Sequence, residues 1–136
     1  MATEKIAKAY FWREGRPRPK SHVGFVQFLR FLGAMRPGER DRVASLFSFS
    51  RFPDFQRRIK TLLTIAYDLE RLAPSLANEG PNPEYPWPHD RPEIAPAKHM
   101  FLIWTDLSSG SGRDLMRIVH IAIARFPDYA DACASD

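Results

Sequence analysis

A run of apolar residues at helical spacing, between residues 53 and 73, is the feature that most constrains the fold. It keeps one helix face apolar through several turns and leaves the other face polar. A proline at position 53 fits the first helical turn, and Asp54 complements the positive end of the helix dipole. The sequence therefore predicts a long amphipathic helix here. Its apolar face is Ile59, Leu62, Leu63, Ala66, Leu69 and Ala73, and its polar face is Arg57, Lys60, Thr64, Asp68 and Arg71.

Two other segments predict major helices with an apolar face. Ser21 suits an N-cap, and a helix rich in phenylalanine is expected to follow it to Met35. A last helix is expected from Ser111, which forms a capping-box-like pattern with Asp114, to about Phe126. The following Pro-Asp pair is expected to turn the chain into a short tail. The apolar faces are Phe25, Phe28, Leu29, Leu32 and Met35 in the first helix, and Leu115, Ile118, Val119, Ala122 and Phe126 in the last.

Shorter helices complete the prediction. One is expected over residues 3–12, with Ile6 and Tyr10 on one face, and another over residues 39–50 after a Pro-Gly pair. Residues 13–20 contain two prolines and four basic residues, which favours an extended, solvated arm. The segment 98–107 fits either a helix or one face of a strand, and we favour the helix.

These segments together predict an all-α fold, a compact bundle of about four to five helices. The length of 136 residues suits a single hydrophobic core. We expect a short helix and basic arm over residues 1–20 and one helical domain over residues 21–136. Within this domain residues 74–97 form a long proline-rich loop, because seven of the twelve prolines lie between residues 74 and 96.

Two pentapeptides are nearly identical: Arg51-Phe52-Pro53-Asp54-Phe55 and Arg125-Phe126-Pro127-Asp128-Tyr129. The residues before them do not match, since Val43 would align with Arg117 and Leu46 with His120. We interpret the two strings as one helix-corner chemistry used twice, and not as an internal repeat.

The expected environment is cytoplasmic, without contact to a membrane. No apolar stretch reaches the roughly 18 residues that a membrane-spanning helix needs. Charged residues near the N-terminus, among them Lys5 and Lys8, interrupt any secretory signal. A single cysteine, Cys133, excludes an internal disulfide and suits a reducing compartment.

Charge is distributed unevenly along the chain. The net charge is +4, but residues 1–73 carry 15 Lys and Arg against 7 Asp and Glu. Clustered cations attract polyanions, whereas scattered ones only solvate helices, so both interpretations stay open at this point. For the first, the candidate residues that contact nucleic acid or an acidic partner are Arg13, Arg16, Arg18, Lys20, Arg36, Arg40, Arg57, Arg58 and Lys60.

A helix-turn-helix would use the helix from Glu39 to Ser50 as its first helix and the helix from Pro53 onward as its recognition helix, which enters a DNA groove in this motif. With Ala44 at the small-residue position, Ser48 falls where glycine is usual. Asp54 and Arg57 fall where apolar side chains are normally buried. The segment resembles the motif only loosely, and we assign no family.

No complete catalytic or cofactor motif is present, so the sequence predicts neither catalysis nor a cofactor. Gly110-Ser111-Gly112 lacks the third glycine and the preceding strand of a dinucleotide-binding loop, and it is interpreted as a linker. His120 is expected at a core or boundary position. The remaining candidate for a metal site is in the loop region, where the possible ligands are His89, Asp90, Glu93 and His99.

The sequence-based hypothesis is a non-catalytic helical binding protein, a subunit, regulator or inhibitor. Its basic N-terminal half would contact nucleic acid or an acidic surface of a nucleoprotein complex. One alternative is a protein–protein or oligomerisation module that uses Tyr85 and Trp87 of the loop, or the phenylalanine-rich helix. Another is a metal-dependent enzyme with ligands on the loop.

Overall fold

The computed structural model describes residues 2–17, 24–72 and 100–132, and these residues form helices joined by short turns. No strand occurs in these three ranges, which confirms the predicted all-α class. The elements are α1 (Ala2–Arg13), α2 (Gly24–Gly33), the 3-10 helix η1 (Pro37–Glu39), α3 (Arg40–Leu46), α4 (Phe52–Arg71), α5 (Leu102–Ser108), α6 (Gly110–Ala124) and α7 (Phe126–Ala132).

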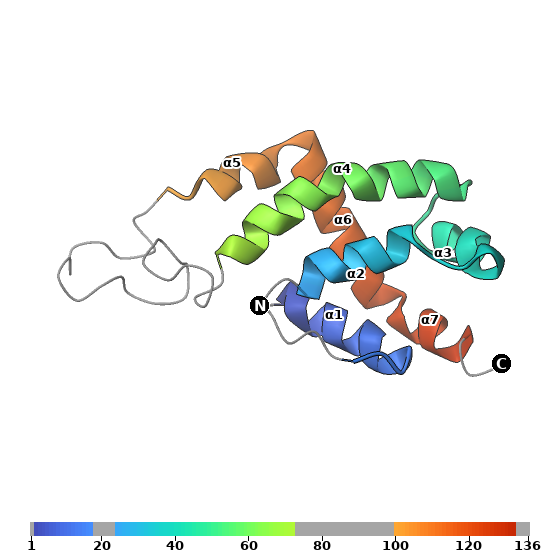
Figure 1. Cartoon of the computed structure of the whole chain (residues 1–136). Coiled ribbons are helices and arrows are strands. Elements are labelled where there is room, and N and C mark those ends of the chain that lie inside the picture. The colour runs from blue at the N-terminus through green and yellow to red at the C-terminus, as the bar shows by residue number, and fades with distance from the viewer. Residues whose placement is uncertain (1, 18–23, 73–99, 133–136) are drawn as a thin grey trace.

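The helices α2 and α4 lie side by side and run in opposite directions (Figure 1). Gln56, near the start of α4, donates a hydrogen bond to the carbonyl of Gly33 at the end of α2, at 2.7 Å. Glu70, near the end of α4, accepts one from the backbone N–H of Phe25 at the start of α2. The helix α1 packs on the other side of α2, and α6 runs from α5 to α7 behind them in this view. The pair α2–α4 is therefore the centre of the fold.

The core is a single cluster that includes α1. The Tyr10 ring lies 4.7 Å from the ring of Phe28, 5.1 Å from that of Phe126 and 4.8 Å from that of Tyr129, measured between centroids. Its hydroxyl donates to the carbonyl oxygen of Ala122 at 2.9 Å. Because buried aromatic pairs with satisfied polar atoms stabilise a core, α1 is tied to α2, α6 and α7. The boundary expected at residue 20 does not separate two cores.

The phenylalanine side chains of α2 serve the core of this chain. Phe25 and Phe28 are fully buried, and Phe31 is partly covered by Phe11 of α1 at 5.7 Å. The aromatic side chains of this helix therefore pack mainly within one molecule, and an interaction through this helix stays a prediction. The other face of α2, with Gln27 and Arg30, is exposed, as is Ala34 directly after the helix.

The chain directly after α1 is folded back, in contrast to the expected extended arm, although Gly15, Arg16 and Pro17 are exposed to solvent as expected. Gly15 has a positive φ of 63°. The N–H of Arg16 donates to the carbonyl of Phe11 at 2.9 Å, and that of Gly15 to the carbonyl of Trp12 at 3.2 Å. This pair of bonds is a Schellman C-cap, which glycine favours because it adopts the left-handed conformation without a Cβ clash. Residues 18–20 lie outside the described residues.

Several helix ends differ from their predicted positions. The ambiguous segment contains the helix α5, as favoured, and the next helix is capped by Ser109, whose hydroxyl accepts from the N–H of Gly112 at 3.1 Å, and not by Ser111. The expected tail after Phe126 is the helix α7.

His120 is exposed, and not at a core or boundary position as expected, because it points away from the core face of α6. Within the described residues no helix has both the length and the apolar character needed to cross a bilayer.

A glycine sets the contact between α5 and α6. A Cβ on Gly112 would lie 2.2 Å from the carbonyl oxygen of Asp106 and 2.3 Å from the Cα of Leu107, both backbone atoms. We expect Gly112→Ala to lower the free energy of unfolding by about 2 kcal/mol or more, since the backbone must move. Urea unfolding followed by circular dichroism measures this. The matched control is Gly110→Ala, which meets no atom within 4 Å. An equal loss in both variants would contradict the steric explanation.

Glu70 makes the stability of the fold depend on pH. Burial, with a smaller contribution from the charge of Glu4, raises the pKa of its carboxyl from 4.5 to about 7, although the hydrogen bonds from the N–H groups of Phe25 and Val26 lower it. The folded state therefore holds the proton more tightly than the unfolded state, so this contribution to stability is present below about pH 4.5 and is lost as pH rises to about 7.

We expect the thermal midpoint of the wild type to fall, relative to that of Glu70→Gln, as pH is raised from 5 to 8. The glutamine keeps an oxygen acceptor for the N–H of Phe25 but does not titrate. Thermal unfolding of both proteins at several pH values measures the difference between the two thermal midpoints. Contributions from titratable groups that the two proteins share cancel in this difference. A difference that stays constant with pH would contradict the assignment.

Candidate polyanion interface

The most regular charged feature is a stripe of exposed side chains along α4. Its residues follow one another at spacings of three and four, which place them on one helix face. The guanidinium of Arg71 lies over the ring of Tyr67, 6.0 Å from its centroid. The stripe extends over roughly 21 Å, at 1.5 Å per residue. It consists of Arg57, Lys60, Thr64, Tyr67 and Arg71, all of which are exposed.

Arg30 of α2 adds a cation beside this stripe. The antiparallel pairing brings Gly33 to Gln56 and Phe25 to Glu70, so Arg30 lies opposite the middle of α4. The side chain of Gln56 contacts α2 from the same flank of α4 that carries Lys60. The exposed sides of the two helices therefore form one continuous surface, which we call the α2–α4 face.

The α2–α4 face has an excess of positive charge. Among the described residues no carboxylate forms an ion pair with Arg30 or Lys60. No acidic residue occupies a position of the stripe, and Asp68 lies at its edge. Uncompensated cations on one surface produce a potential that attracts polyanions. This surface therefore satisfies the electrostatic requirement of a nucleic-acid contact.

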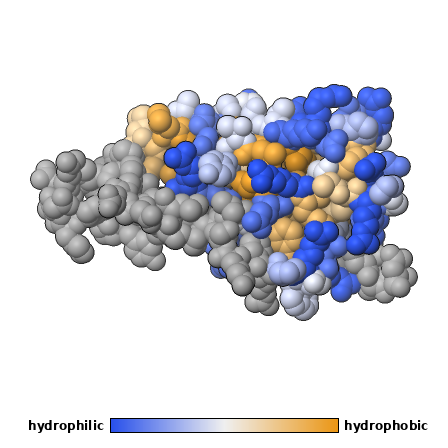
Figure 2. Space-filling view, viewed as in Figure 1, coloured by the Kyte–Doolittle hydropathy of each residue, from blue (hydrophilic) through white to orange (hydrophobic). Residues whose placement is uncertain are grey.

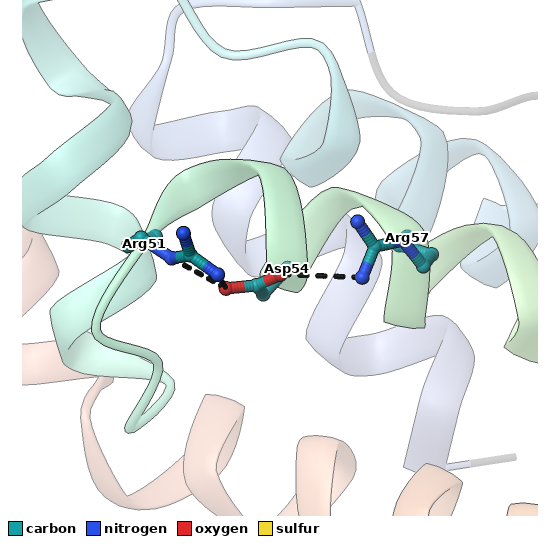
Figure 3. A network of polar contacts seen from close by, with 3 residues as sticks. All are labelled: Arg51, Asp54 and Arg57. Atoms are coloured by element: carbon teal, nitrogen blue, oxygen red, sulfur yellow. Dashed lines mark hydrogen bonds and ion pairs between the residues drawn. The ribbon is translucent and has the colours of Figure 1, made fainter.

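One carboxylate is shared by two guanidinium groups at the start of α4 (Figure 3). Asp54 accepts from Arg51 at 2.8 Å and from Arg57 at 3.2 Å, one on each carboxylate oxygen. Two positive charges held by one negative charge leave a net charge of +1, so this network stays basic. Figure 2 shows hydrophilic side chains gathered over α3 and the first half of α4, where the network lies.

The same corner occurs once more, which confirms that one chemistry is used twice. At the start of α7, Arg125 binds Asp128 at 2.9 Å, as Arg51 binds Asp54. In both helices proline follows phenylalanine in the first turn, where its missing N–H costs nothing. Only Asp54 binds a second arginine.

The structure does not gather all the predicted contact residues on one face. Arg57 and Lys60 belong to the α2–α4 face. Arg58 lies on the opposite flank of α4 and binds Asp114 of α6 at 2.8 Å. Arg36, beside η1, is exposed, and Arg13 is the partly buried last residue of α1.

Two other predicted arginines pack against aromatic rings. Arg16 lies over Phe31, 4.7 Å from the ring centroid. Arg40 donates to the carbonyl of Met35 at 3.1 Å and lies 5.3 Å from the ring centroid of Phe52. Their charges stay partly accessible, but their side chains are held in place. The remaining predicted contact residues, Arg18, Lys20, Tyr85 and Trp87, lie outside the described residues.

Three charged or aromatic members of the α2–α4 face are absent from the predicted contact residues: Arg30, Tyr67 and Arg71. Tyr67 and Arg71 could have been found from the sequence, because positions 57, 60, 64, 67 and 71 form a helix face without an acidic residue. The broader polar face of the predicted helix includes Asp68 and so hid this pattern. Arg30 had no local signal, since its position beside α4 depends on tertiary packing.

The turn between α3 and α4 shows which part of a helix-turn-helix is present. Ser48 has a positive φ of 63°, the conformation for which such a turn normally uses glycine. Asp54 and Arg57, however, point to solvent and bind each other, while Phe52, Phe55 and Ile59 are buried. The turn is therefore similar to that motif, but the register of the second helix is different.

A cluster of metal-binding side chains is not seen in the described part of the chain. No group of three or more His, Cys, Asp or Glu side chains lies close enough to hold a metal ion there. The loop residues His89, Asp90, Glu93 and His99 fall outside it. Gly110-Ser111-Gly112 is the first turn of α6 and not a linker. No protein-family model, curated protein or solved structure matches this chain.

The shared carboxylate allows a direct comparison of two ion-pair corners. We expect Asp54→Asn to lower the free energy of unfolding by about 0.5–1 kcal/mol, since exposed ion pairs are screened by solvent. Asp128→Asn removes a single pair and is expected to cost less. Urea unfolding of both variants at low and high salt measures the difference. An equal or larger loss for Asp128→Asn would show that the second arginine adds no stability.

Proposed function

We propose that this chain is a non-catalytic helical protein that binds nucleic acid through the α2–α4 face. The observation that carries the proposal is the exposed stripe on α4, joined by Arg30, without an acidic residue at any of its positions. The cations of Lys60 and Arg71 would contact phosphates without reading the base sequence. The binding is therefore expected to depend strongly on salt and weakly on sequence.

Tyr67 supports nucleic acid over an acidic protein surface as the ligand. Its ring is 49% exposed although it is a large aromatic side chain on a core helix. The guanidinium of Arg71 lies on one side of the ring. An aromatic ring beside cations can stack on an unpaired base while the cations contact the backbone. An acidic protein surface offers carboxylates to the cations but no base on which the ring can stack.

Binding to labelled oligonucleotides tests the proposal. Fluorescence anisotropy with single-stranded and duplex DNA of 20 nucleotides, and with the corresponding RNA, is measured from 25 to 200 mM KCl. We expect the logarithm of the association constant to fall linearly with the logarithm of salt concentration. For Lys60→Ala/Arg71→Ala we expect the slope for duplex DNA to decrease by about 2, because each lost phosphate contact contributes about 0.9.

The matched control is Arg113→Ala/Arg117→Ala, which removes the same charge from the exposed face of α6. Its slope is expected to stay close to that of the wild type. Equal losses in the two double variants would show that only net charge matters. No binding of any of the probes at 25 mM KCl would refute the proposed function.

A further inference from the structure

A second surface, of different chemistry, lies between α1 and the end of α6. It contains a hollow of about 220 Å³ that is open to solvent. The long side chain of Lys5 stands at the hollow and is exposed. Its walls are formed by Ile6, Ala9, Tyr10, Ala122, Ile123 and Phe126.

The walls of this hollow offer almost only apolar surface. Apart from the amine of Lys5 at the rim, the one polar side-chain atom of the lining residues is the hydroxyl of Tyr10, and it already donates to the carbonyl of Ala122 at 2.9 Å. Burial raises the pKa of this hydroxyl above its usual range, so it stays a neutral donor. Sites for small molecules normally present a few free polar groups that fix orientation. The hollow instead suits an apolar side chain that a larger molecule presents.

Exposed apolar side chains continue this surface along both helices. Met116 and Ile123 lie seven residues apart on one face of α6, and they are 50% and 56% exposed. On α1, Trp12 follows Lys5 and Ala9 on the same helix face and is 65% exposed. We call the hollow together with these three exposed side chains the α1–α6 surface. Large apolar side chains that are grouped on a surface mark an interaction site.

Cations border the α1–α6 surface on both helices. Lys5 lies on α1, and Arg113 and Arg117 lie on the exposed face of α6. The single acidic residue of α6, Asp114, points to the other side and binds Arg58. On α1 the carboxylate of Glu4 binds Lys8. The surface therefore combines an apolar centre with a positive border.

We propose that the α1–α6 surface binds an amphipathic helix of a partner protein, whose apolar stripe is flanked by carboxylates. Helices dock in this way by inserting side chains at spacings of three and four into an apolar depression. Acidic residues beside that stripe would complement Lys5 and Arg117. The partner inserts one bulky apolar side chain into the hollow, next to Ile123, and covers Met116 and Trp12.

The test uses the full chain and a display library of helical 18-residue peptides with random apolar, acidic and basic positions. Selection on the wild type is compared with selection on Ile123→Glu and on Lys5→Glu. Both residues are exposed, so both variants are expected to fold. We expect enriched peptides to carry large apolar residues at spacings of three and four with acidic residues beside them.

For the best peptide, titration calorimetry is expected to show at least about a tenfold loss of affinity with Ile123→Glu. Lys5→Glu is expected to weaken binding and to remove the preference for acidic over basic peptides. The control variant Lys60→Glu lies on the α2–α4 face and is expected to keep full peptide affinity while nucleic-acid binding is lost. The two proposals can therefore fail separately.

Several results would overturn this inference. Enriched peptides without acidic residues, or affinity that survives both Ile123→Glu and Lys5→Glu, would remove the proposed surface. Self-association of the chain that Ile123→Glu abolishes, without any peptide selection, would assign the surface to a second copy. Binding of decanoate with loss in Lys5→Glu, again without peptide selection, would assign it to a small amphiphile.

Discussion

The packing of α2 against α4 is the contact on which the rest of the structure depends. Fully buried side chains, among them Phe28 of α2 and Ile59 of α4, remove a large apolar area from water. Glu70 holds one end of the pair by accepting from the N–H groups of Phe25 and Val26, and Gln56 holds the other end. This antiparallel pairing also sets the rotation of both helices, and so it decides which polar residues share the outer face.

Which basic side chains of this protein have a neighbouring partner matters more than how many basic side chains there are. The basic residues of the first half separate into two groups once the chain folds. Some are held by neighbours, as Arg58 is by Asp114 and Arg16 by the ring of Phe31. Others, such as Arg30 and Lys60, have no ion pair among the described residues and lie on one surface. A polyanion gains most from the second group, because these cations need not give up a partner on binding.

The α2–α4 face and the α1–α6 surface differ in the physical effect that would hold a ligand. The first offers separated cations along roughly 21 Å of helix, where the attraction is electrostatic and screened by salt. The second offers exposed Met116, Ile123 and Trp12 around an apolar hollow, where burial of surface dominates. Since the surfaces lie on different helices, apart from the shared core, variants on one leave the chemistry of the other unchanged.

The sequence by itself determined the longer helices and the all-α class, because apolar periodicity is a local property, as in the long helix over Ile59 and Leu62. The corner before Asp54 followed from the equally local chemistry of Pro53 and Asp54. The tertiary structure decided what depends on distant neighbours. Only the packing of the helices shows that α1 shares the core through Tyr10 and that Arg30 lies beside α4. It also shows that Glu70, a residue of α4, is buried against the first residues of α2. Whether a basic side chain forms an ion pair depends on which carboxylate the folded chain brings close to it. The distance between two such groups in space cannot be derived from their separation along the sequence.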